Sequence, residues 1–110
     1  MSRKTEDTGS HTNSICMKVY RIGNDVLLAA CDAELIGKTL RSGEIEFKVS
    51  EKFYKEVIGD EELLKKNLSL ATIGNLVGER CVRCAIEMGL VNPENVIKID
   101  CIPHAQFVII

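Results

Sequence analysis

Two short motifs near the C-terminal end carry the residue types that most often bind a metal. Cys81 and Cys84 form a C-x2-C pair, and Cys101 and His104 form a C-x2-H pair after sixteen intervening residues. Thiolates and imidazoles at such spacings close the tetrahedral shell of a structural zinc ion. One hypothesis is therefore a small zinc-stabilised protein, with zinc held by these three cysteines and one histidine.

The surroundings of the cysteines favour a different interpretation. Cys81 and Cys84 fall on the apolar face of a predicted helix, and a buried free cysteine commonly behaves as a small hydrophobic residue. A redox C-x-x-C pair needs its first thiol at a helix N-terminus, whereas the predicted helix has Cys81 in its middle. We therefore expect these cysteines, together with Cys31, to fill the core, and we expect no cofactor.

A second group of polar residues could form a binding surface. His104 and Gln106 follow Pro103, so a rigid extended segment would display an imidazole and an amide. The alternative is structural, with His104 bound to a backbone carbonyl. The wetter side of the predicted helix carries three further candidates: Asn75, Glu79 and Arg80.

These residues are compatible with several roles. They could face His104 across a groove and bind a ligand, or they could form an ordinary solvated helix face with a Glu79–Arg83 pair. His104 with Glu79 could also serve as the acid–base pair of a small enzyme. The sequence has no P-loop, no G-x-G-x-x-G, no H-E-x-x-H and no G-x-S-x-G motif. We therefore predict no catalytic residues, and a protein that is more typical of binding than of catalysis.

Charge and aromatic content limit the possible partners. Sixteen acidic and 14 basic side chains give a formal net charge of −2, so RNA binding would need a local patch. Two tyrosines and three phenylalanines provide little material for a stacking platform. The cations of the C-terminal half are scattered as in an ordinary solvated surface: Lys65, Lys66, Arg80, Arg83 and Lys98.

Periodicity and turn residues indicate the elements that position these groups. Residues 15–31 predict a β-hairpin around a Gly-Asn-Asp turn, and residues 45–49 alternate as in a strand with one wet face. Apolar residues spaced by three or four from Leu70 to Met88 predict one long helix. A strand over residues 96–99 should be interrupted at Pro103, and residues 107–110 should add an edge strand or cover the core.

Three polar residues are predicted to start helical turns. Asp32 precedes a short turn that Gly37 closes. Ser50 precedes a helix over residues 51–57, and Asp60 precedes the next helix. Strands before and after a helical middle favour an α+β fold, a two-layer sandwich with helices packed on one face of a small, mainly antiparallel sheet.

Length and composition indicate one domain. The 110 residues are 45% hydrophobic, enough for a single core. Residues 1–16 are polar and aperiodic, so we predict a disordered N-terminal tail followed by a single α+β domain over residues 17–110. No apolar run reaches bilayer length, and five cysteines without an export signal indicate a reducing, cytoplasmic compartment.

Three blocks of sequence resemble a known family. The blocks are Met17–Arg21 with Leu28–Asp32 and Leu35–Lys38, then Ala71–Arg80, then Pro93–Val96 with Ile102–Gln106. Read together, they resemble the archaeal domain-of-unknown-function family numbered four hundred and twenty-four. The resemblance implies a cytoplasmic archaeal protein with a two-layer α/β sandwich, which is predicted to bind RNA and is linked to translation.

The resemblance also implies a set of positions for a binding surface. The family's motif positions fall here on Asn75, Gly78, Glu79, Arg80, Pro103, His104 and Gln106. Cys81, Cys84 and Cys101 depart from the family, whose members more often carry small residues there, which weakens zinc as a family function. Our first hypothesis is a non-enzymatic module that binds RNA or a translation component through Asn75, Glu79, Arg80, His104 and Gln106, without a membrane partner.

Overall fold

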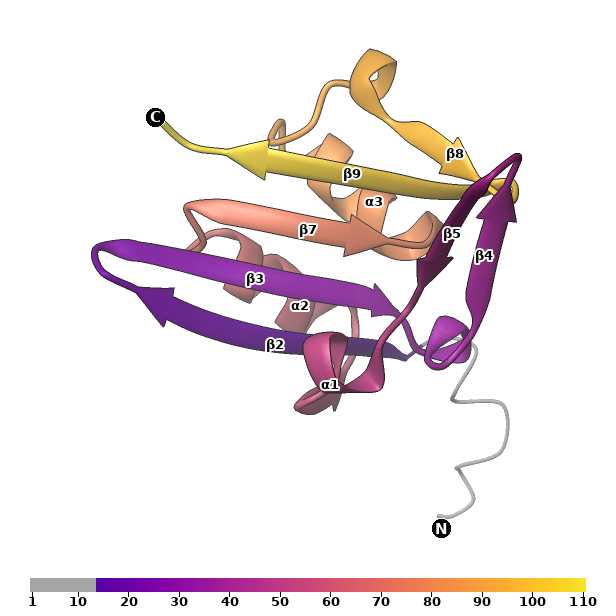
Figure 1. Cartoon of the computed structure of the whole chain (residues 1–110). Helices are drawn as coiled ribbons and strands as arrows, with labels where there is room; N and C mark the ends of the chain where they lie inside the picture. The colour runs from indigo at the N-terminus through magenta and orange to yellow at the C-terminus, as the bar shows by residue number, and fades with distance from the viewer. Residues whose placement is uncertain (1–13) are drawn as a thin grey trace, which may run out of the picture.

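A six-stranded mixed sheet is the central element of the chain, as described for residues 14–110 in a computed structural model (Figure 1). The strand order is β6-β2-β3-β7-β9-β8. Neighbouring strands are antiparallel except for the parallel pair β3 and β7. The predicted α+β class and mainly antiparallel sheet are therefore confirmed.

The first two strands form the predicted hairpin. Strand β2 (Ile15–Ile22) pairs with β3 (Asp25–Asp32), and Gly23 takes a positive φ of 61° in the turn between them. The side chain of Ile15 is fully buried. The domain boundary predicted at Met17 therefore falls inside β2. Of the disordered tail predicted over residues 1–16, residues 1–13 lie outside the described residues.

The other elements follow in chain order: the 3-10 turn η2 (Ala33–Leu35), β4 (Thr39–Ser42), β5 (Ile45–Lys48), α1 (Glu51–Tyr54), β6 (Val57–Gly59), α2 (Glu61–Leu68), β7 (Ile73–Val77), α3 (Glu79–Glu87), the 3-10 turn η3 (Pro93–Asn95), β8 (Ile97–Ile99) and β9 (Ile102–Val108). Strands β4 and β5 form a separate two-stranded arm. Two predicted caps are confirmed, because Ser50 accepts the N–H of Phe53 and Asp60 accepts that of Leu63. None of the helices in residues 14–110 is long and apolar enough to cross a lipid bilayer.

The helix predicted from Leu70 to Met88 is wrong. Its first half is strand β7, and only residues after Gly78 are helical. Strand β7 lies inside the sheet and packs on both faces, so its apolar residues do not alternate and can match a helical spacing. Gly78, with φ at 114°, separates the strand from α3.

The interruption predicted at Pro103 is also wrong, because β9 runs through it and lies between β7 and β8. The C=O of Pro103 accepts the N–H of Gly78 at 2.9 Å. A residue with an N–H at this position would return a bond to the C=O of Gly78. That C=O already accepts the N–H of Val82 in α3 at 3.0 Å, so proline removes no rung here.

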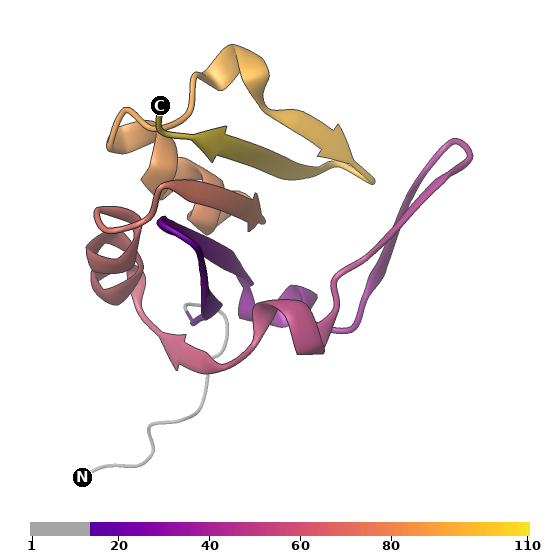
Figure 2. The same ribbon diagram turned by 60° about the vertical axis from the view of Figure 1, so that its left-hand side comes forward.

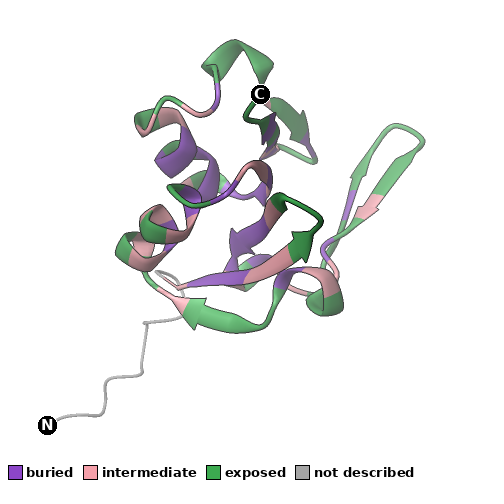
Figure 3. Cartoon of the chain, turned by 90° about the vertical axis from the view of Figure 1, so that its left-hand side faces the viewer, coloured by how far each residue is buried: buried purple, intermediate pink, exposed green. Residues whose placement is uncertain are grey.

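The helices cover the sheet unequally. Helices α2 and α3 pack on one face over the larger core cluster, which includes Ile15, Leu28, Leu76 and Phe107. Helix α1 and the base of the arm pack on the other face, near one end (Figure 2). Figure 3 shows the buried residues gathered in the central strands and inner helix sides, with the arm largely exposed. The prediction of helices on one face therefore fails for α1.

Candidate functional site on the open sheet face

Three of the five predicted binding residues share one face of the sheet. We define the open face as the face opposite α2 and α3. Asn75 pairs with Gln106, and Val77 pairs with His104; directly opposed residues of paired strands point to the same side. Because Val77 packs in the cluster beneath α1, the side chains of Asn75, His104 and Gln106 all lie on the open face.

Asn75 is fixed from one side only. The hydroxyl of Tyr54 in α1 donates to Oδ1 of Asn75 at 2.7 Å. Burial raises the pKa of the Tyr54 hydroxyl, so this group stays a proton donor at neutral pH. The bond orients the Asn75 amide with Nδ2 as its remaining polar atom. Nδ2 carries two N–H groups that can donate to a ligand.

His104 is held by a hydrogen bond at one ring nitrogen, and its imidazole lies beside one aromatic ring. Its Nδ1 lies 2.9 Å from the carbonyl oxygen of Leu76, a contact that requires the proton on Nδ1. Nε2 of the neutral ring is then a hydrogen-bond acceptor. The ring of Phe47, in the arm, lies 5.3 Å from the imidazole, centroid to centroid. The bond between His104 and a backbone carbonyl, which was the structural alternative, is thus observed. This bond leaves Nε2 able to bind a ligand.

Aromatic side chains gather around the same face. Tyr20 and Phe53 stack with centroids 5.4 Å apart, and like Phe47 they are half-buried. Lys18 lies in the cross-strand row of Asn75 and Gln106 and has its ammonium 5.2 Å from the centroid of Tyr20. No local pattern groups these rings, because α1 and the arm bring Phe53 and Phe47 to the sheet from distant segments.

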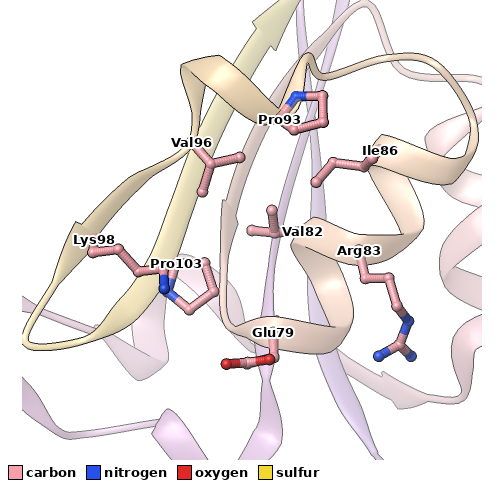
Figure 4. A pocket seen from close by; sticks show the side chains of 8 residues that line it. All are labelled: Glu79, Val82, Arg83, Ile86, Pro93, Val96, Lys98 and Pro103. Atoms are coloured by element: carbon pink, nitrogen blue, oxygen red, sulfur yellow. The ribbon is translucent and has the colours of Figure 1, made fainter.

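Glu79 lies on the other side of the sheet. It lines a groove of about 390 Å³ between α3 and the η3–β8 segment, with Val82, Arg83, Ile86, Pro93, Val96, Lys98 and Pro103 (Figure 4). Strand β9 separates this groove from the His104 ring, so the geometry does not support a His104–Glu79 acid–base pair. Nor does Glu79 pair with Arg83, which instead forms an ion pair with Glu61 at 2.6 Å.

Arg80 belongs to a partly buried polar anchor and not to the open face. Its guanidinium donates to Glu34 at 2.8 Å and to the Ser14 carbonyl at 3.1 Å, and it lies 3.9 Å from the Asp32 carboxylate. The Asp32 carboxylate also accepts the backbone N–H groups of Arg80 and Cys81, each at 3.1 Å. Asp32 therefore caps α3, and its side chain makes no bond to the turn that the sequence predicted it would cap.

Gly78 makes this cap possible. A Cβ at position 78 would lie 2.4 Å from Cγ of Asp32, and the φ of 114° is one that other residues rarely adopt. The sequence could not indicate this role, because Asp32 and the α3 N-terminus are far apart along the chain. Gly78 and Arg80, two of the motif positions that the family resemblance implies, thus serve the attachment of α3 to β3.

The four residues of the zinc hypothesis are not gathered into one ligand set. Cys81 and Cys84 are fully buried in the core beneath α3, as the core interpretation predicted, whereas Cys101 is exposed in the β8–β9 turn and His104 lies on the open face. Within residues 14–110, no group of three or more histidine, cysteine, aspartate or glutamate side chains is arranged to hold a metal.

The buried thiols are also poor nucleophiles. The helix begins at Glu79, so Cys81 lies in the first turn of α3 and not mid-helix as predicted. Burial, with the charge of Asp32 adding to it, raises the pKa of the Cys81 thiol well above its ordinary value. Burial raises the pKa of Cys84 to about 11. Both thiols stay protonated at neutral pH, which disfavours a redox pair.

Fold and site together define a small α+β protein with a mixed sheet, two helices on one face and a polar, ring-flanked open face. A family model described as "Protein of unknown function (DUF424)" matches residues 20–110, and the chain belongs to this family. The structure is similar to a crystal structure of an uncharacterized conserved protein from Methanopyrus kandleri. The two share 23% sequence identity over 88% of this chain and 92% of that one, with a TM-score of 0.78, which supports the fold. No curated protein matches the chain.

Proposed function

We propose that this protein is a non-enzymatic interaction module that binds single-stranded RNA on its open face. One observation carries the proposal: the amides of Asn75 and Gln106 and the imidazole of His104 lie together on the face that α2 and α3 leave free. The translation link implied by the family resemblance is consistent with an RNA ligand.

The chemistry of these groups suits unpaired bases. Proteins read single-stranded RNA by hydrogen bonds to base edges and by stacking bases on planar side chains. Asn75 offers donors, His104 offers an acceptor, and the exposed Gln106 offers both. The half-buried rings of Tyr20, Phe53 and Phe47 flank this row of polar groups.

The charge distribution predicts that RNA affinity depends only weakly on salt concentration. The net charge of −2 provides little general attraction to phosphates. Lys18 supplies local positive charge on this face, because its ammonium lies 5.2 Å from the centroid of the Tyr20 ring. With no more than about two phosphate contacts, the slope of log K against log salt concentration should be no steeper than about −1.4.

Fluorescence anisotropy with a mixed set of short, labelled RNA oligomers tests the proposal. We expect saturable binding that His104→Ala and Gln106→Ala each weaken at least about tenfold, the equivalent of 1.4 kcal/mol. Glu79→Gln, on the opposite side of the sheet, is the matched control and should bind as the wild type does. Circular dichroism verifies that each variant is folded.

Two results would overturn the proposal. One is the absence of wild-type binding to every oligomer at low salt. The other is equal affinity of the wild type and the two open-face variants. If instead a protein is recovered through His104 and Gln106 while RNA is not bound, the open face is a protein-binding surface and the RNA proposal is wrong.

A further inference from the structure

We infer that the uncovered edge of β9 pairs with the same edge of a second copy of this chain, joining two sheets into one. Strand β8 pairs only with residues 102–104 of β9, although β9 continues to Val108. Beyond residue 104, no strand lies against the outer edge of β9 in the part of the chain that the structure describes. This inference depends on the backbone and does not require RNA binding.

Hydrogen bonds on the inner edge show which backbone groups face outward. Gly78 donates to Pro103 at 2.9 Å, and Ile109 donates to Thr72 at 2.7 Å. In an antiparallel pair, the backbone N–H and C=O groups of every second residue bond to a given neighbouring strand. The backbone groups of the odd-numbered residues of this segment therefore point toward β7. The N–H and C=O groups of Gln106 and Val108 therefore point away from the sheet.

This edge lacks the features that usually prevent association. Natural edge strands carry charges, prolines or bulges, or they are very short. Residues 105–110 contain neither a charged side chain nor a proline, and Val108 and nearby Ile97 are 63% and 54% exposed. The opposite edge, β6, is only three residues long and is flanked by Glu56 and Asp60. Of these two edges, the β9 edge is therefore the one suited to pairing.

A second copy is the occupant that this edge fits. The side chains of residues 105–110 are uncharged, so those of two copies do not repel each other. A two-fold axis at Val108 pairs Val108 with its equivalent and pairs Gln106 with Ile110 of the second copy. A two-fold axis at Phe107 would bring Ile110 of the second copy opposite His104, where Ile97 already pairs. The Val108 register avoids this clash and gives outward groups of both chains a partner.

Pairing of this kind has a consequence for the open face. Directly opposed residues in antiparallel strands point to the same side, so the two open faces would continue across the junction. The Gln106 side chains of both copies would then lie on one continuous surface, with the pair of Val108 residues between them. If the proposed RNA binding holds, one strand of RNA could contact both copies, and this consequence alone rests on the proposed function.

Sedimentation equilibrium of the full chain over a wide concentration range tests the inference. We expect a monomer–dimer equilibrium, and Val108→Pro should lower its association constant at least about tenfold by removing an outward N–H and its hydrogen bonds. The bonds to β7 remain, because the Val108 N–H points away from it. Ile22→Lys is the control, since Ile22 is similarly exposed, at 59%, but lies at the β2–β3 turn.

A second variant and a second measurement keep the test decisive. If Val108→Pro is misfolded by circular dichroism, Val108→Lys brings two like charges together at the axis and should also give monomers. Amide hydrogen exchange at Gln106 and Val108 should slow as protein concentration rises. A wild type that is monomeric at millimolar concentration, or a dimer that folded Val108 variants leave intact, would overturn the inference. RNA binding by a monomeric variant would show that the two proposals are independent.

Discussion

The two faces of the sheet use polar side chains in different ways. On the helix-covered face, Asp32 is 3% exposed, and its two carboxylate oxygens accept the N–H groups of Arg80 and Cys81. On the open face, Asn75 is held through Oδ1 alone and His104 through Nδ1 alone, while Gln106 is exposed. A polar group whose bonding capacity is filled within the protein stabilises the fold, and one with capacity left can bind a ligand.

Residues that lie close together in the sequence are placed on different sides of the sheet. Asn75, Gly78 and Arg80 lie within one short stretch, and the sequence alone gives them equal claim to a binding site. The alternation of β7 directs Asn75 to the open face, whereas Gly78 and Arg80 fall where α3 meets Asp32. In this chain, one short stretch therefore holds both the anchor of α3 and a residue of the open face.

The largest expected effect is on the anchor. Asp32→Ala should lower the free energy of unfolding by about 3–5 kcal/mol, because it leaves a partly buried guanidinium and two helix N–H groups without their carboxylate. Chemical denaturation measures the loss. Glu34→Ala is the control: Glu34 bonds the same guanidinium, but its side chain is 43% exposed, and its loss should cost less than about 1 kcal/mol. Equal losses for the two variants would contradict the assignment of Asp32 as the anchor.

A smaller effect is expected from the residue that makes room for the cap. Gly78→Ala should cost about 2–4 kcal/mol, since it combines a strained φ with a contact between Cβ and the Asp32 carboxylate. Gly43→Ala is the matched control, because Gly43 also has a positive φ, 62°, but nothing lies within 4 Å of its Cβ position. Strain alone should cost about 1–2 kcal/mol there. If both variants lose the same stability in denaturation curves, proximity to Asp32 has no energetic role.

Elements fixed by local chemistry could be predicted from the sequence. The β2–β3 hairpin follows from its turn residues, and the Ser50 and Asp60 caps follow from side chains that bond within three residues. The division of residues 70–88 into strand β7 and helix α3 could not be predicted from local chemistry. Whether residues 73–77 form a strand depends on β3 and β9, which bracket β7 in the sheet and come from both ends of the chain.

The candidate site could also be predicted only in part from the sequence. His104 and Gln106 could be selected because Pro103 indicated an extended segment, and Asn75 because it fell on the wetter side of the predicted helix. Their juxtaposition was predicted across a helix groove, whereas they lie on adjacent strands. The exclusion of Arg80 and the contribution of Tyr54 depend on partners distant in sequence, Asp32 for Arg80 and Asn75 for Tyr54, which no local pattern indicates.

The smallest expected effect separates stability from orientation on the open face. Tyr54→Phe removes the hydroxyl bound to Asn75, and Tyr20→Phe removes the hydroxyl that donates to the Phe53 carbonyl at 2.8 Å. Each should cost about 1 kcal/mol of stability, the typical net value of one hydrogen bond. Only Tyr54→Phe should free the Asn75 amide, which NMR detects as shifted and broadened side-chain N–H resonances. Unchanged Asn75 resonances in Tyr54→Phe would mean that Asn75 is oriented by the sheet itself, and that α1 contributes to the open face only by packing.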